Sequence, residues 1–318
     1  MADQELTLIE AAKLEKPSYA TGLIGTYAEA YPNFAVAPIV PSDRIYSWDV
    51  EDDLPYTGST GSRLVGADFD STQGNVKPYS SEVKAYGGKI QVDEYIEDNL
   101  PKSVAAQEIM QMKSFARKAY IDTFQGAGGA DFRGIKDWLD NDSGFSGQTV
   151  NASGASQAVI SLDMLDELIS KMVITPFTQI HANPIVIRKI WQLNRGNASA
   201  GYFVQSARSE VGQVPMAYNG IPLIPTSDGK NANLFSVVEP DYATTPTSCS
   251  LYIVTWGMEG ALYHSSNTTL GANGAPIPQL VKATPGTNYT YTRMKYYLGF
   301  APTAIRCIGR IRYLANSL

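Results

Sequence analysis

Apolar and polar residues alternate in two segments that lie within the first hundred positions of the chain. An alternation with a period of two predicts β-strands that have one apolar face. Glycine, serine, threonine and proline fill much of the stretch between the two segments, so the pattern predicts two β-ribbons around a tip. A two-stranded ribbon is marginal by itself in water, so its apolar face must lie on the body of this chain or on a neighbouring copy. The apolar residues of this face are Tyr46, Trp48, Val50, Ile90 and Val92.

One long helix is predicted directly after the ribbons. Apolar residues recur at helical spacing from about Lys102 to Gln125, and Gly126 is expected to stop the helix. At 1.5 Å per residue this helix is about 35 Å long, which is enough to span a domain. Before the ribbons, a capping box at residues 7–10 opens a short helix that ends at Pro17, and further prolines keep the chain extended. This part is predicted to be a segmented arm.

From Gln157 onward, the pattern alternates between helices and strands. Ser161 and Asn183 are predicted to cap two helices, and Gly196 is expected to end the second of them. Gly309 falls on the apolar parity of the last strand without a side chain to pack, which predicts a close approach of the backbone to another element. Strands are expected at residues 177–182, 221–224, 234–238 and 251–255 and within the tail 289–314.

The composition favours a subunit of an assembly. Hydrophobic residues make up 44% of the 318 residues, whereas charged residues make up 18%, below the roughly 25% usual for soluble domains. A net charge of −6 argues against a nucleic-acid-binding surface spread over the whole chain. No apolar run approaches a membrane span, and the first residues lack the basic and apolar regions of a signal peptide, so a secreted protein is not expected.

Few residues are suited to catalysis or to metal binding. His181 and His264 are the only histidines, and no G-x-S-x-G nucleophile motif occurs. The only two cysteines, Cys249 and Cys307, do not have the spacing of metal ligands or of a disulfide framework. We therefore expect structural histidines and reduced thiols, and we predict no catalytic residue, no metal site and no cofactor.

Two charged segments, residues 140–144 and the three arginines of the tail, can be interpreted either as ligand sites or as structural features. Residues 140–144 resemble the start of a calcium loop, but Asn151 stands where the bidentate glutamate belongs, so a turn is expected. Three arginines on one parity of the last strand could contact phosphate. Because acidic residues outnumber basic ones in this chain, we expect instead that they pair with carboxylates across a contact. These arginines are Arg306, Arg310 and Arg312.

The middle of the chain contains a strand, a helix that begins at Asn183-Pro184, and a short strand with small residues and prolines. This order resembles that of the major capsid proteins of tailed double-stranded DNA bacteriophages, which have the HK97 fold. Residues 6–14 are also similar to the start of several such proteins. The residues that carry the resemblance in the middle are Ile187, Ile190, Trp191, Leu193, Gly201-Tyr202-Phe203, residues 220–226, residues 251–254 and Trp256-Gly257.

The resemblance implies an α+β protein with an HK97-like capsid fold. Such a fold has an N-terminal arm, an extended β-hairpin called the E-loop, a peripheral domain with a long spine helix, an axial α/β domain, and closing strands of the peripheral domain. In this chain the five parts correspond to residues 1–42, 43–98, 99–154, 155–275 and 276–318, in that order.

The resemblance also implies a function. The chain would assemble with itself into hexamers and pentamers of an icosahedral virion shell, built in the host cytoplasm without a membrane, which encloses DNA without sequence-specific binding. Scaffolding would have to be a separate protein or absent, because the arm begins almost at the first residue. Portal and decoration proteins would be further partners. Some family members cross-link an E-loop lysine, but neither Lys77 nor Lys84 has an identifiable acceptor, so no cross-link is expected. The expected contacts between subunits are the apolar ribbon face, the arm residues Leu6, Leu8 and Ile9, and the three arginines.

Two other functions remain open. An encapsulin-like compartment shares the fold but encloses enzymes instead of a genome. A cytosolic α/β enzyme with an oligomerising arm is the more distant alternative. It would need a polar pocket with perturbed acids, and the small number of histidines and cysteines disfavours it.

Overall fold

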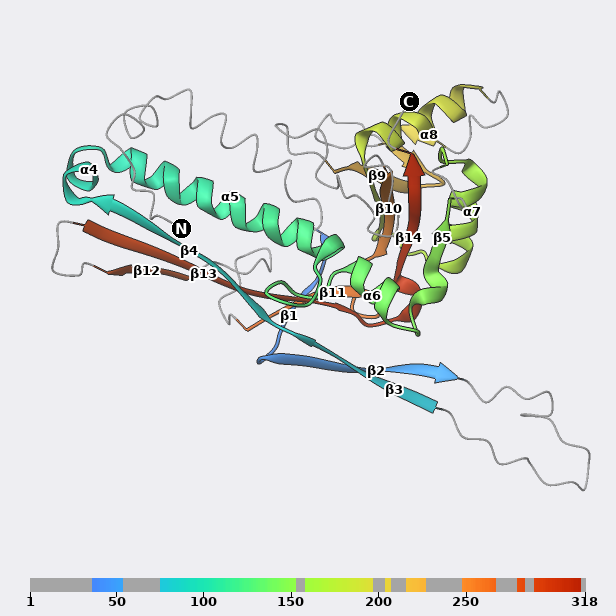
Figure 1. Cartoon of the computed structure of the whole chain (residues 1–318), viewed down its shortest axis with the longest axis horizontal. Coiled ribbons are helices and arrows are strands. Elements are labelled where there is room, and N and C mark those ends of the chain that lie inside the picture. Colours follow the sequence, from blue (N-terminus) through green and yellow to red (C-terminus); the bar gives the residue numbers. More distant parts are fainter. Residues whose placement is uncertain are drawn as a thin grey trace, which may run out of the picture.

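A five-stranded sheet, a seven-stranded sheet and a two-stranded ribbon make up the part of the chain that the structure describes (Figure 1). The structure is a computed structural model, and it describes residues 36–53, 75–152, 158–196, 204–206, 216–226, 248–266, 279–283 and 289–315. Among these residues, no helix is long and apolar enough to cross a membrane. The two sheets share the helix α5 (Pro101–Gln125), because its residues Tyr120 and Phe124 contact His181 and Tyr252 of the seven-stranded sheet.

The seven-stranded sheet has two helices packed on one of its faces. Its strand order is β5-β14-β10-β6-β9-β8-β7, with both parallel and antiparallel pairs. Side chains of α7 (Leu162–Lys171) and α8 (Pro184–Gly196) join residues of the sheet in one apolar cluster. The strands are β5 (Thr149–Asn151), β14 (Ile308–Ala315), β10 (Ser248–Thr255), β6 (Thr178–Ala182), β9 (Ile221–Pro225), β8 (Met216–Tyr218) and β7 (Val204–Ser206).

The five-stranded sheet is organised around the 14-residue strand β13 (Tyr289–Pro302). One half of β13 pairs with β4 (Lys84–Asp93) on one side and with β12 (Gln279–Ala283) on the other. Its last residues pair with β11 (Ala261–Ser265), which in turn pairs with β1 (Ile39–Pro41). The short helix α4 (Glu94–Asn99) leads into the long helix α5 (Pro101–Gln125), which runs alongside β4 and β13 (Figure 1).

The two-stranded ribbon consists of β2 (Ile45–Asp53) and β3 (Asn75–Glu82), which pair in antiparallel register. Residues 54–74 connect the two strands along the chain. In Figure 1 the ribbon lies below both sheets and points away from the end at which α4 lies. Between the ribbon and the seven-stranded sheet lie α6 (Ile135–Asn141) and the single turn η1 (Ser146–Gln148), and another single turn, η3 (Ile305–Cys307), precedes β14.

Several predicted element boundaries are confirmed because they depend on local chemistry. The long helix ends at Gln125, and the backbone N–H of Gly126 donates to the carbonyl of Asp122. The Ser161 hydroxyl accepts from the backbone N–H of Met164 at 3.3 Å, as expected of a helix cap. Asn183 caps α8 in the same way, with its side-chain oxygen 3.0 Å from the backbone N of Ile185.

The close approach predicted at Gly309 is also confirmed. A Cβ added to this residue would lie 2.5 Å from the sulfur of Met172 and 2.9 Å from a methyl carbon of Leu168. Both contacts come from the region of α7, so the missing side chain lets this helix lie directly on β14. A larger residue at this position would force the side chains of Met172 and Leu168 to shift.

One prediction about strand pairing is wrong. The segment with Ile90 and Val92 does not form a second ribbon, because it is β4 and pairs along its whole length with β13. The tail 276–318 contributes to both sheets, since β12 and β13 lie in the five-stranded sheet and β14 lies between β5 and β10 in the seven-stranded sheet. The strand β11, within the range predicted for the axial domain, lies in the five-stranded sheet. The predicted arm residues 1–35 and the strand at 234–238 lie outside the described residues.

Candidate assembly surface

The inner face of the ribbon is anchored on the body of its own chain by aromatic side chains. The Trp48 ring lies 5.8 Å from the ring of Trp138 on α6 and 6.1 Å from that of Tyr79, measured between centroids. Tyr46 stacks on the ring of His264 at 5.4 Å. Val50 and Tyr79 are both 7% exposed and belong to the same apolar cluster as Trp138. The base of the ribbon is therefore part of the core.

Polar contacts fix the same region. The Tyr79 hydroxyl donates to a carboxylate oxygen of Asp142 at 3.3 Å, and the Lys77 ammonium lies 3.6 Å from that oxygen. The backbone N–H of Gly144 donates to the same carboxylate oxygen at 3.1 Å. Asp142 thus organises a turn, which confirms the predicted turn for residues 142–144, whereas Asp140 and Asn141 form the end of α6. Among the described residues, no group of histidine, cysteine and acidic side chains could hold a metal ion.

The five residues predicted to contact a neighbour through the ribbon therefore have partners within their own chain. Val92 is 2% exposed and forms a small cluster with Ile96 and Val104, against which Ile90 packs. Val50 is likewise buried in the core. Val50 and Val92 have little surface left to offer a second copy, which corrects the expectation for these two residues. Ile90, Tyr46 and Trp48 are only partly buried, so contact with a neighbour stays a prediction for these three residues.

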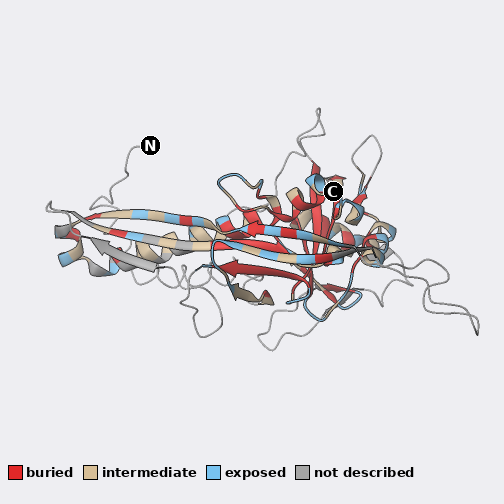
Figure 2. Ribbon diagram, turned by 90° about the horizontal axis from the view of Figure 1, so that it is seen from below, coloured by how far each residue is buried: buried red, intermediate tan, exposed pale blue. Residues whose placement is uncertain are grey.

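The outer face of the ribbon is exposed. Ile45 and Val76 are 50% and 53% exposed, although both are large apolar residues. Ser47, Asp49 and other residues of the same parity are exposed as well. Figure 2, in which the molecule is seen from below, shows buried and exposed residues alternating along the strands on this side. The ribbon thus has one face bound to its own body and one face available for contact.

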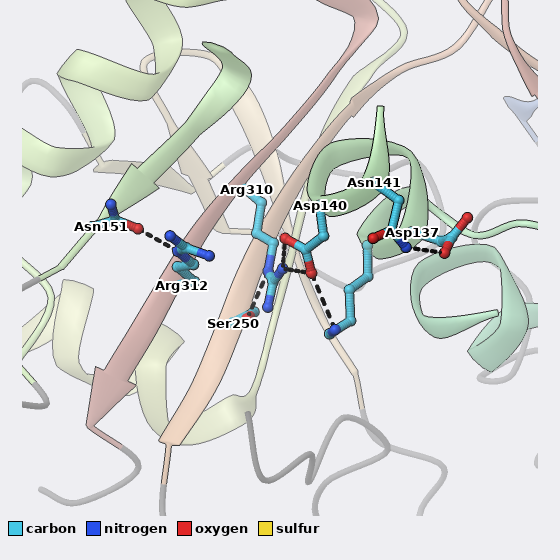
Figure 3. A network of polar contacts seen from close by, with 8 residues as sticks. Asp137, Asp140, Asn141, Asn151, Ser250, Arg310 and Arg312 are labelled. Atoms are coloured by element: carbon cyan, nitrogen blue, oxygen red, sulfur yellow. Dashed lines mark hydrogen bonds and ion pairs between the residues drawn. The ribbon is translucent and has the colours of Figure 1, made fainter. Parts of the chain in front are cut away.

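The arginines of the tail are held by their own chain (Figure 3). Arg310 is 0% exposed, and its guanidinium contacts both carboxylate oxygens of Asp140 at 3.0 Å and the Ser250 hydroxyl at 3.1 Å. Burial by itself would raise the pKa of Asp140, but the charges of Arg310 and Lys136 outweigh this effect and hold that pKa below its ordinary value. This ion pair ties β14 to α6.

The other two arginines have different partners. Arg306 lies in the turn η3, before the strand, and donates to the backbone carbonyls of Lys171 and Ser170 at 2.8 and 3.0 Å. Arg312 donates through Nε to the side-chain oxygen of Asn151 on β5. The three arginines therefore do not form one charged face. The expected pairing across a contact is replaced by an ion pair within the chain for Arg310, and it stays a prediction for Arg306 and Arg312.

Both histidines are buried and have structural roles in the described contacts. His181 is 0% exposed with the Tyr120 hydroxyl 3.1 Å from Nδ1, and burial lowers its pKa to about 3. His264 is also 0% exposed, and burial lowers its pKa to about 4. It lies 3.0 Å from the Ser42 hydroxyl and 3.1 Å from the Ser81 hydroxyl.

The contact between Ser81 and His264 is not that of an activated nucleophile. The Ser81 hydroxyl donates its single proton to the backbone carbonyl of Phe300 at 2.7 Å. Ser81 must then accept from Nε2–H of His264, whereas a nucleophile would need to donate to the imidazole. The contacts of His264 with Ser81 and Ser42 join β11 to β3 and to the residue that follows β1. Cys249 and Cys307 are buried free thiols, and burial raises the pKa of Cys307 to about 12.

Sequence reasoning missed Trp138, which anchors the ribbon, and the role of Asp140. Ile135, Trp138 and Leu139 are buried and have the spacing of one helix face, so their apolar pattern was the signal available for α6. No comparable signal marked Asp140, because its partner Arg310 lies 170 residues away in the sequence.

No family model matches the chain, and no curated protein matches it by sequence. Solved structures do match it. The SrpI encapsulin of Synechococcus elongatus aligns with a TM-score of 0.64 at 13% identity, covering 100% of this chain and 94% of that one. The capsid protein of cyanophage A-1(L) aligns with a TM-score of 0.62 at 11% identity over 89% and 92% of the two chains. The capsid of a native GTA particle aligns with a TM-score of 0.57 at 11% identity over 89% and 91%.

The chain has the HK97-like capsid fold. At such low identities the likeness shows the fold alone, but it covers nearly the whole of each chain. The resemblance deduced from the order of motifs is therefore confirmed at the level of the fold.

Proposed function

We propose that the chain is the major capsid protein of a tailed double-stranded DNA bacteriophage. It assembles with itself into hexamers and pentamers, which form an icosahedral shell around the genome. The observation that supports this proposal is the HK97-like fold over nearly the full chain, found in the capsids of cyanophage A-1(L) and of the GTA particle. In this proposal the ribbon β2–β3 with residues 54–74 is the E-loop, and α5 is the spine helix.

The ribbon gives the proposal a physical mechanism. Its base is fixed to the body by Trp48 and Tyr79, so the direction in which it projects is set by its own chain. A projection of one copy that contacts the body of the next makes a heterologous interface, and repetition of such an interface closes into rings. Burial of exposed apolar side chains such as Ile45 and Val76 would contribute roughly 25 cal/mol per Å², before the costs of association are subtracted.

The proposal is tested by removing the segment that connects β2 and β3 without disturbing the core. Removal of all of residues 43–98 would also remove β4 and the buried Tyr79, so residues 54–74 alone should be replaced by a two-residue Asn-Gly turn. We expect the shortened chain to fold with an unchanged thermal midpoint but to form no closed shells in electron microscopy, whereas the full chain forms them. Normal shells from the shortened chain would contradict a role of residues 54–74 in assembly. A full chain that forms only a small compact oligomer would contradict the capsid function.

A cellular encapsulin-like compartment is the second candidate, and one observation favours it. The SrpI encapsulin matches 100% of this chain with a TM-score of 0.64. The two functions differ in what the particle contains. Particles purified from the native source should protect DNA from nuclease if the chain is a capsid protein, and should contain a copurified enzyme without protected DNA if it is an encapsulin. The enzyme alternative has no support from the two histidines, since both are buried and have structural partners.

The capsid proposal has consequences for location and partners. The chain would be part of the virion capsid and would be assembled in the host cytoplasm. It would enclose DNA without sequence-specific binding, with scaffolding, portal and decoration proteins as separate partners. The N-terminal residues Leu6, Leu8 and Ile9 stay predicted contacts between subunits.

A further inference from the structure

A polar pocket lies between α6, the strands β5 and β14 and the end of α5 (Figure 3). Its volume is about 620 Å³, which is enough for one or two side chains of another molecule. The lining residues that matter for its chemistry are Lys136, Asp137, Asp140, Thr149, Asn151 and Arg312. All of them come from described parts of the chain, and they lie outside the aromatic anchor of the ribbon.

Positive charge is in excess around this pocket. Its two carboxylates already have cationic partners: Asp137 pairs with Arg133 at 2.6 Å, and Asp140 pairs with the buried Arg310 at 3.0 Å. Lys136 is a second partner of Asp140 at 3.1 Å. Arg312 is then a further cation in the lining, and among the described residues it has no ion pair with a carboxylate.

Two side chains in the lining can make further hydrogen bonds. Arg312 donates from Nε to Asn151, whereas its two terminal nitrogens have no hydrogen-bond partner among the described residues. The hydroxyl oxygen of Thr149, on the adjacent strand β5, is buried and has no hydrogen-bond partner there either. A guanidinium with two available terminal nitrogens matches the two oxygens of a carboxylate, and a nearby hydroxyl can donate a third bond.

We propose that this pocket binds a carboxylate side chain of a second copy of the chain. The proposal rests on the capsid function, because it names a contact between subunits of the shell. A second copy is the favoured source, since the chain carries 31 acidic residues against 25 basic ones. A nucleic-acid duplex is disfavoured, because binding to its backbone requires a row of cations along the surface, whereas this pocket offers one unpaired guanidinium.

The contribution of the pocket is tested with Arg312→Gln, which removes the charge but keeps a polar side chain of similar length. We expect the concentration needed for shell formation, measured by light scattering and electron microscopy, to rise at least about tenfold. Arg312→Lys should restore part of the loss. The matched control is Arg293→Gln, an exposed cation on β13 outside the pocket, which should assemble like the unmodified chain. All variants are compared at equal fractions folded, measured by circular dichroism.

Assembly of Arg312→Gln at the same concentration as the unmodified chain would overturn the proposal while leaving the capsid function intact. An unmodified chain that remains monomeric would overturn both. An equal loss in the Arg293→Gln control would show a general charge effect and would also overturn the proposal.

The source of the carboxylate is identified by cross-linking. A photoreactive amino acid replaces Ser146, an exposed residue at the rim of the pocket, in an isotopically heavy chain that is assembled with a light chain. We expect cross-linked peptides that join heavy and light chains, with the light peptide containing an aspartate or glutamate. Cross-links confined to one chain, or cross-links to nucleic acid, would overturn the proposal.

Discussion

Replacement of Asp140 by Asn should destabilise the folded chain by about 3–5 kcal/mol. Arg310 is 0% exposed, so its charge stays buried when the carboxylate that compensates it is removed. An uncompensated buried charge costs far more than the loss of an exposed ion pair. The expected result is a fall of roughly 10 °C in the thermal midpoint. Urea denaturation with an unchanged slope would show that the change lies in stability and not in the extent of unfolding.

The control for this prediction is Asp137→Asn in the same helix. Asp137 pairs with Arg133 at 2.6 Å, but the side chain of Arg133 is 33% exposed, so water can solvate the arginine when its partner is lost. The expected cost is below about 1 kcal/mol. Equal losses in the two variants would show that helix α6, and not the buried arginine, determines the effect.

The same ion pair predicts how stability depends on pH. Because the pKa of Asp140 in the folded chain is held below its ordinary value, the ionised carboxylate stabilises the fold above the unfolded pKa of about 4. This stabilisation is lost as the pH falls below that value and the carboxylate takes up a proton. The difference in unfolding free energy between the unmodified chain and Asp140→Asn should therefore shrink as the pH falls below about 4. A difference that stays constant below this pH would contradict the assignment.

Local chemistry made ends of the helices α5, α7 and α8 predictable. The cap residues Ser161 and Asn183 and the stop at Gly126 specify helix ends through hydrogen bonds to residues at most a few positions away. The close approach at Gly309 was also predictable from the sequence, because a residue without a side chain in an apolar row implies a close neighbour. The order of these elements was sufficient for the HK97-like fold to be identified from the sequence.

Strand pairing and the candidate contact surface depend on residues far apart in the sequence. The register of β4 is set by β13, which lies about two hundred positions later, and alternation alone cannot distinguish such a partner from an adjacent strand. The apolar face of the ribbon was predicted correctly as a face, but its partner Trp138 lies on a helix that was not predicted. Which face of the ribbon is buried on the body and which is exposed is therefore visible only in the folded structure.

Replacement of Trp138 by Ala should both destabilise the chain and release the ribbon. The indole is 1% exposed, and its ring lies 5.5 Å from Phe145, 5.8 Å from Trp48 and 6.0 Å from Tyr79. Loss of so large a buried side chain costs about 3–5 kcal/mol. Trp138→Phe keeps an aromatic ring against the ribbon and should cost on the order of 1–2 kcal/mol. Denaturation in urea measures both values.

Hydrogen exchange distinguishes release of the ribbon from a general loss of stability. Release of the ribbon accelerates exchange only in its own strands, whereas a general loss of stability accelerates it in all strands. In Trp138→Ala the amides of β2 and β3 should exchange faster than those of β10, which lies in the seven-stranded sheet and keeps its other contacts. Shell formation should fail for this variant under conditions where Trp138→Phe still assembles, since a ribbon without a fixed base has no fixed direction towards the next copy. Uniformly faster exchange in all strands would instead mean that Trp138 stabilises the fold as a whole and does not act as the anchor of the ribbon.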